Sequence, residues 1–121
     1  MAVVDDDENL RRSFARLLRA AGMRPITYES AEAFLADTIR PSLDCLVLDV
    51  QLPGMSGLDL QNRLSSEGNK TEILFITAYD DIDASQTAYA KGCAGYFRKS
   101  DSGKEVLDAI RGAVARLGEQ V

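Results

Sequence analysis

The sequence predicts an α/β fold, in which a doubly wound, five-stranded parallel sheet is covered by helices on both faces. Five short apolar runs alternate along the chain with longer stretches whose apolar residues recur at helical spacing. The short runs are continuously apolar, which is typical of strands buried on both faces. Strands of that kind occur in parallel sheets that lie between two layers of helices.

The length of 121 residues fits one domain, so we expect residues 1–121 to form a single unit. A net charge of −5 disfavours direct nucleic-acid binding, which needs a basic surface. No apolar run approaches the roughly 18 residues of a membrane span, and no charged-then-apolar leader is recognisable. We therefore expect a cytoplasmic protein without membrane or nucleic-acid contacts.

The five predicted strands are short. Residues Ala2–Val4 are too few and too β-branched for a helix, and Cys45–Leu48 form an uninterrupted apolar run. Each run ends at a polar residue or shortly before one. The predicted strands cover residues 2–5, 25–28, 43–48, 73–77 and, approximately, 96–99.

Five helices are predicted to follow the strands. Gly22 is a stop signal for the first, Ser30 can cap the second, and Ser102 with Glu105 forms a capping box for the last. The third is expected to end near Glu67. The expected apolar faces are Leu10, Phe14, Leu17, Leu18 and Ala21; Ala31, Phe34 and Leu35; Leu60 and Leu64; Ala84, Ala88 and Tyr89; and Val106, Leu107, Ile110, Val114 and Leu117.

Right-handed crossovers leave few ways to connect these elements, and five strands of this size suit the flavodoxin-like order 2-1-3-4-5. In that order the first and third strands are neighbours, at the point where the winding reverses. Ligands of such sheets bind at this point, outside the carboxyl ends of the strands. The residues that follow the strands are therefore the candidate functional residues.

The residues that follow the strands could together bind a metal ion and a phosphoryl group. Asp5 and Asp6 follow the first strand, Asp49 the third, Thr77 the fourth and Lys99 the fifth. Clustered carboxylates repel one another and raise their own pKa values, and a hard divalent cation relieves that repulsion. Mg²⁺ binds through one or two carboxylates, water and phosphate oxygens. A hydroxyl and an ammonium beside the same site would suit a phosphoryl group.

Several segments resemble the receiver domain of two-component response regulators. They are Val3–Glu8, Leu48–Gly57, Ile76–Ala78 and Lys99, which occur in the family's order over essentially the whole chain. The segment 30–35 is similar to the FixJ-type branch in particular. Four motifs in register are stronger evidence than any one of them alone.

The resemblance implies a signalling switch that takes a phosphoryl group from a sensor histidine kinase or histidine phosphotransfer protein. The chain contains no histidine, so any phosphohistidine belongs to another protein. The switch would change its interaction surface to control an output domain or partner, without being a turnover enzyme. A C-terminal output domain beyond this chain and a phosphorylation-dependent homodimer are compatible with the resemblance.

Site roles carry over from the family residue by residue. The reaction would be Mg²⁺-dependent, and the lysine and hydroxyl would bind phosphoryl oxygens. An aromatic residue would change rotamer with the hydroxyl residue. The implied roles are phosphoacceptor for Asp49, metal ligands for Asp5, Asp6, Asp49 and the backbone carbonyl of Gln51, phosphoryl contacts for Thr77 and Lys99, and switch residues Thr77 and Tyr96.

Two positions of this chain carry expectations of their own. The family usually has a proline after the lysine, whereas this chain has Ser100; we expect the Lys99–Ser100 peptide bond to be trans, because a cis bond without proline costs about 2.5–4 kcal/mol. The resemblance places Tyr79 beside the route by which water reaches the phosphoryl group, where its ring would cover the approach, and this predicts a long-lived phosphorylated state. The alternative is that Tyr79 simply lies on the surface.

Other functions fit the residues less well. A haloacid-dehalogenase-type metal-dependent phosphatase has two aspartates spaced like Asp5 and Asp7, but Glu8 and Asn9 replace the expected Gly and Thr. Asp7 is equally interpretable as a helix cap. A flavin carrier is disfavoured, because three aspartates after the first strand would repel its phosphate. Turnover of small phosphate esters would distinguish a phosphatase from a receiver.

Overall fold

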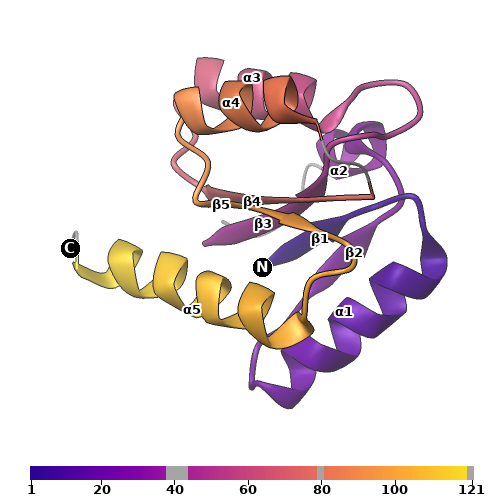
Figure 1. Ribbon diagram of the computed structural model, residues 1–121, viewed down its shortest axis with the longest axis vertical. Helices are drawn as coiled ribbons and strands as arrows, with labels where there is room; N and C mark the ends of the chain where they lie inside the picture. The colour runs from indigo at the N-terminus through magenta and orange to yellow at the C-terminus, as the bar shows by residue number, and fades with distance from the viewer. Residues whose placement is uncertain (38–43, 79–80, 120–121) are drawn as a thin grey trace.

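The structure, a computed structural model, describes residues 1–37, 44–78 and 81–119. Within these residues one parallel sheet has the strand order β2-β1-β3-β4-β5 (Figure 1). This confirms the predicted α/β fold and its flavodoxin-like strand order; Leu43, expected in the third strand, lies outside the described residues. The strands are β1 Ala2–Val4, β2 Ile26–Tyr28, β3 Cys45–Asp49, β4 Glu72–Thr77 and β5 Gly95–Arg98.

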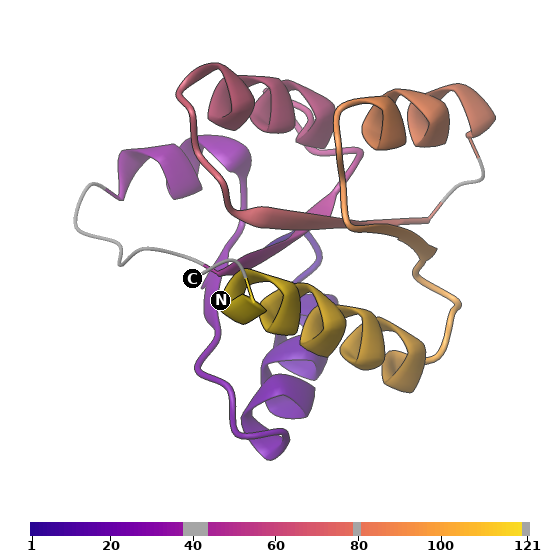
Figure 2. The same cartoon turned by 90° about the vertical axis from the view of Figure 1, so that its left-hand side faces the viewer.

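Helices cover both faces of the sheet. In Figures 1 and 2, α1 and α5 lie against one face, and α2, α3 and α4 lie against the other. Because side chains alternate along each strand, Val3 and Val47 pack toward the first pair, whereas Val4 and Leu48 pack toward the other three. The helices are α1 Glu8–Ala20, α2 Ala31–Ala36, α3 Gly57–Ser66, α4 Ile82–Ala90 and α5 Gly103–Glu119.

Short polar side chains cap the helices, which the sequence predicts at Ser30 and Ser102 and allows at Asp7. Asp7 caps α1, Ser30 caps α2 and Asp81 caps α4, in each case by accepting a hydrogen bond from a backbone N–H in the first turn. Ser56 and Asp59 form a reciprocal capping box at α3. The hydroxyl of Ser102 accepts from the Glu105 N–H at the start of α5, at 3.2 Å.

The expected apolar faces are correct for most positions, with one clear correction. Ala84 and Ala88 are buried under α4, but Tyr89 is 54% exposed, because it lies about 100° around the helix from Ala88. On α5, Val114 is half-buried while Ala113 is fully buried, and the side chain of Leu117 lies outside those described. In the part of the chain that the structure describes, no helix is long and apolar enough to cross a membrane.

Candidate functional site

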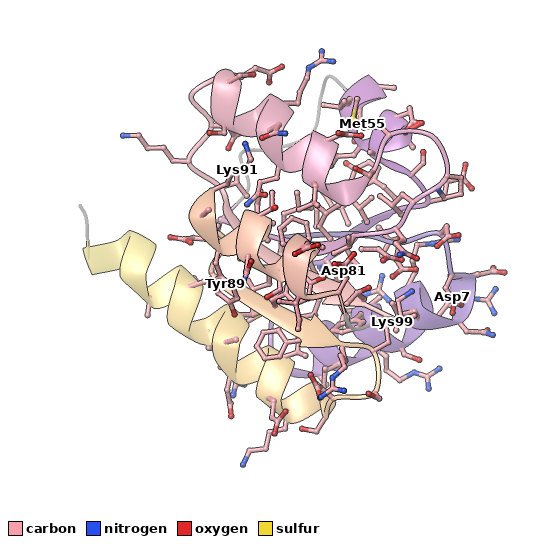
Figure 3. The ribbon with its side chains drawn as sticks, turned by 45° about the horizontal axis from the view of Figure 1, so that its top comes forward. Asp7, Met55, Asp81, Tyr89, Lys91 and Lys99 are labelled. Atoms are coloured by element: carbon pink, nitrogen blue, oxygen red, sulfur yellow. The ribbon has the colours of Figure 1, made fainter. Side chains whose placement is uncertain are left out.

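The carboxyl ends of four parallel strands bring the candidate residues to one edge of the sheet. The register pairs Val4 with Leu48 and Asp49 with Ile76, so the residues that follow β1 and end β3 lie side by side. Asp5, Asp49 and Thr77 are the polar residues buried at this edge, with at most 3% of each exposed. Lys99 follows β5 and is labelled at this edge in Figure 3.

Lys99 joins the two buried carboxylates. Its Nζ lies 3.0 Å from Asp49 Oδ2 and 3.1 Å from Asp5 Oδ2. Burial opposes the charge of Lys99, but its contacts with Asp49 and Asp5 outweigh that effect and raise its pKa. The ammonium therefore stays charged and holds together two groups that would otherwise repel each other.

The negatively charged form of Asp5 is disfavoured in the folded protein. Burial, together with repulsion from Asp49, raises its pKa from 3.8 to about 6, although the Asp7 N–H and Lys99 act in the opposite direction. Asp6 adds a third carboxylate, which is exposed. Oxygens of Asp5, Asp6 and Asp49 all lie within 4.8 Å of one another. Three hard oxygen donors with uncompensated negative charge fit a divalent cation.

Backbone hydrogen bonds hold the two loops that carry these carboxylates. Asp5 Oδ1 accepts from the Asp7 N–H at 2.8 Å, and Asp49 Oδ1 accepts from the Gln51 N–H at 3.1 Å. The guanidinium of Arg11 donates to the Asp5 carbonyl oxygen at 2.8 Å. The structure thus places Gln51 directly beside Asp49. It also adds Arg11 to the residues that hold the site, although nothing in the sequence distinguishes Arg11 from the neighbouring Arg12.

Asp7 does not join the acidic group. Its carboxylate accepts from the Asn9 and Leu10 N–H groups at 2.9 and 3.3 Å and so completes the first turn of α1. The interpretation of Asp7 as a helix cap is confirmed. The phosphatase alternative needs Asp7 as a reacting group, and this cap leaves that alternative without its second aspartate.

The remaining predicted residues lie on β4 and β5. Thr77 ends β4, and Tyr96 is half-buried on β5, where its ring packs on Phe75 with 6.0 Å between centroids. The Lys99–Ser100 bond is trans, as expected, since no cis peptide occurs in the described residues. Asp101 closes the turn there by accepting from the Arg98 N–H at 2.8 Å. Tyr79 lies outside the described residues.

Comparison with known proteins identifies the family. The family model of the response regulator receiver domain matches residues 1–111. The chain is 36% identical to the response regulator protein TmoT of Ectopseudomonas mendocina, over 98% of this chain and 54% of that protein. It is 32% identical to the transcriptional regulatory protein FixJ of Azorhizobium caulinodans, over 98% of this chain and 56% of that protein.

Solved structures agree with the sequence relatives. The response regulator StyR superposes with a TM-score of 0.89 at 36% identity, over 98% of this chain and 60% of that chain. The chain spans about half the length of the curated relatives that it matches. The match of family, fold and acidic strand ends shows that the chain belongs to the response regulator receiver domain family of two-component systems.

Proposed function

We propose that Asp49 accepts a phosphoryl group in a Mg²⁺-dependent reaction and that the chain acts as a signalling switch rather than a turnover enzyme. The observation that carries this proposal is the position of the Asp49 carboxylate. It ends a central strand, is 3% exposed, contacts Lys99 and lies close to the carboxylates of Asp5 and Asp6. A carboxylate so placed is shielded from bulk solvent yet borders the edge where ligands of doubly wound sheets bind.

The residues have distinct tasks in the proposed reaction. An oxygen of Asp49 forms the bond to phosphorus while the bond from phosphorus to the donor nitrogen breaks, and the freed imidazole remains on the donor. Lys99 neutralises charge on the phosphoryl oxygens, and Thr77 donates its hydroxyl to one of them. Little covalent help is needed, because positioning and charge neutralisation supply most of the rate in phosphoryl transfer.

Asp5, Asp6, Asp49 and the backbone carbonyl of Gln51 would hold Mg²⁺. The ion supplies neutralisation of the negative charge that gathers when a phosphoryl group approaches three carboxylates. Asp5 would gain from it, because burial and repulsion from Asp49 raise its pKa to about 6. Lys99 remains between Asp5 and Asp49 and limits their mutual repulsion.

The signal would leave the site through Thr77 and Tyr96. Thr77 ends β4 and pairs with Arg98 of β5, and two positions back in the same register Phe75 pairs with Tyr96. A shift of Thr77 toward the phosphoryl group would change the space beside Tyr96 and so its rotamer. Such a change would alter the surface around α4 and β5 that a partner meets.

The proposed partners follow from the family and from the length of its members. A sensor histidine kinase or a histidine phosphotransfer protein is the donor. Residues 1–121 form one receiver domain, and a longer parent would carry a C-terminal output domain as its relatives' extra length suggests. We further propose a cytoplasmic location and a phosphorylation-dependent homodimer.

Asp49→Asn tests the proposal. The wild-type protein incubated with acetyl phosphate should gain one acid-labile phosphoryl group with Mg²⁺ and none with EDTA, whereas Asp49→Asn should gain none in either buffer. Intact mass and peptide mapping measure the adduct. Asp44→Asn is the matched control, since Asp44 is exposed and directly precedes β3, at the end of the strand away from Asp49. Wild-type labelling of Asp49→Asn would refute the assignment.

A further inference from the structure

The segment 30–35 is similar to the FixJ-type branch of the family, but none of its residues takes part in the proposed phosphorylation chemistry. Ser30 caps α2 by accepting from the Ala33 N–H at 3.0 Å. Ala31 and Phe34 are almost fully buried, and the Phe34 ring meets Tyr28 edge-on at 5.3 Å. The remaining side chain of the first turn, Glu32, is exposed but is presented from a firmly anchored helix.

Glu32 contacts the loop that follows Asp49, across 23 positions of sequence. The Met55 N–H donates to Glu32 Oε1 at 3.2 Å and to Oε2 at 3.4 Å. In Figure 3, Met55 lies beside α2. A backbone N–H shared by two carboxylate oxygens is a charge-assisted hydrogen bond, which is stronger than a neutral one.

Gly54 shows independently how closely the two segments approach. Its φ of 76° is unfavourable for residues with a side chain, and a methyl group there would overlap the Glu32 carboxylate. The glycine therefore serves both the turn and the close approach of Glu32.

The loop between β3 and α3 is held at several points. The Gln51 N–H donates to Asp49 Oδ1, Leu52 is 8% exposed, and Ser56 caps α3. Between Leu52 and Ser56, the Met55 side chain packs against the core, and its backbone N–H donates to Glu32. Loss of that hydrogen bond would leave the Met55 backbone held through its side chain alone.

We propose that Glu32 is a positioning residue for the phosphorylation site: by holding Met55 it fixes the loop 51–56, whose Gln51 carbonyl would be one of the metal ligands. This inference rests on the proposed function, because it concerns the same metal site. Glu32 itself touches neither the metal ligands nor the phosphoryl group. The segment 30–35 thereby acquires a role in the reaction through a contact made entirely at the protein surface.

Two variants of Glu32 and one control variant test this role. Glu32→Ala should raise the Kd for Mg²⁺ about three- to tenfold, the range expected for loss of one hydrogen bond to a charged, solvent-exposed group, and should slow labelling by acetyl phosphate at limiting Mg²⁺. Glu32→Gln should recover most of the affinity, because its amide oxygen can accept the same N–H. Glu29→Ala removes an equal charge from the neighbouring turn and should change the Kd less than twofold.

Gly54→Ala provides a second route to the same effect without removing charge. Its methyl group displaces Glu32, whereas the backbone strain at φ 76° acts in both backgrounds, so it should weaken Mg²⁺ binding more in the wild-type background than in the Glu32→Ala background. Calorimetric titration gives each Kd, and melting curves in EDTA report the fold separately. A merely structural role for Glu32 would lower the melting temperature and leave the Kd unchanged.

The outcomes separate this inference from the proposed function. Unchanged Mg²⁺ affinity in Glu32→Ala, equal losses in Glu32→Ala and Glu29→Ala, or no recovery in Glu32→Gln would each overturn the positioning role while wild-type labelling at Asp49 still stands. If the wild-type protein neither binds Mg²⁺ nor takes up phosphate, the proposed function fails first, and the role of Glu32 falls with it.

Discussion

Asp6 and Asp7 are adjacent carboxylates with opposite tasks. Asp6 is exposed and contributes an oxygen to the acidic group with Asp5 and Asp49. The Asp7 carboxylate instead accepts backbone hydrogen bonds in the first turn of α1 and caps that helix. One residue step therefore separates a side chain that we assign to function from one that serves stability, and the two assignments make a crossed prediction.

Asp6→Ala should weaken Mg²⁺ binding at least tenfold and leave the free energy of unfolding in EDTA unchanged or slightly higher, because a repelling charge is removed. Asp7→Ala should do the reverse: it should cost about 1 kcal/mol of stability through loss of the cap and change Mg²⁺ affinity little. Urea unfolding in EDTA and calorimetric titration measure the two quantities. A large loss of stability in Asp6→Ala would show that Asp6 is structural.

At the scale of elements, the junction of β3 and α3 is unusually close. Gly57 is the first residue of α3, its N–H donates to the Val50 carbonyl oxygen at 2.9 Å, and a methyl group on it would overlap the Asp49 carbonyl oxygen. The helix thus begins against the end of the strand that carries Asp49, the proposed phosphoacceptor. Gly68 differs, since it has a φ of 72° but open space around the position of a Cβ.

The contrast between these glycines predicts unequal costs. Gly57→Ala should destabilise the protein by about 2–4 kcal/mol, because backbone atoms cannot move aside as a flexible side chain can. Gly68→Ala should cost only about 1–2 kcal/mol, from the left-handed backbone conformation alone. Urea unfolding compares both with wild type. Equal losses would show that the close approach at Gly57 relaxes without cost.

The elements were predictable where local signals were strong. The caps of Ser30 and Ser102 and the apolar run of β3 are local patterns, and each marks an element correctly. The prediction that Tyr89 lies on the buried face of α4 is wrong, because the apolar stripe of this helix is weak. A weak stripe leaves the rotation of the helix about its own axis poorly determined by the sequence. Gln61 also gave no signal, although it is 3% exposed and donates to the Ala88 carbonyl oxygen at 3.1 Å.

The site was predictable for a different reason. Parallel strands bring their carboxyl ends together whatever the loops do, so Asp5, Asp49 and Thr77 could be assigned to one edge from the sequence alone. The side chains of Arg11 and Glu32 bind backbone groups of the site loops. Which backbone group a side chain binds cannot be recognised from the residue types alone. Their roles depend on distances between loops, which only the structure supplies.

At the scale of the whole molecule, the buried charge cluster couples stability to pH. The folded protein holds a proton on Asp5 up to its raised pKa of about 6, whereas the unfolded chain releases it near 3.8. Between these values the folded state binds more protons, so this group's contribution to stability is present below about pH 4 and is lost as the pH rises through about 6.

Asp5→Asn should remove this dependence. The free energy of unfolding of Asp5→Asn minus that of wild type should increase between pH 4 and pH 7, by an amount on the order of a few kcal/mol, when both are measured by urea unfolding in EDTA. Asp108→Asn, on the exposed side of α5, controls for the loss of one charge. A difference that stays constant with pH would show that Asp5 is well compensated in the metal-free protein.

The contact between Lys99 and Asp5 spans 94 positions of sequence and joins residues next to the first and last strands of the chain. A nascent chain therefore cannot assemble this site until β5 has been made and has docked beside β4. A cation that binds only the assembled site stabilises the complete fold and none of its precursors, by RT ln(1 + [L]/Kd). Competence to receive a signal would then coincide with completion of folding, so partly folded molecules would not be phosphorylated by the proposed kinase.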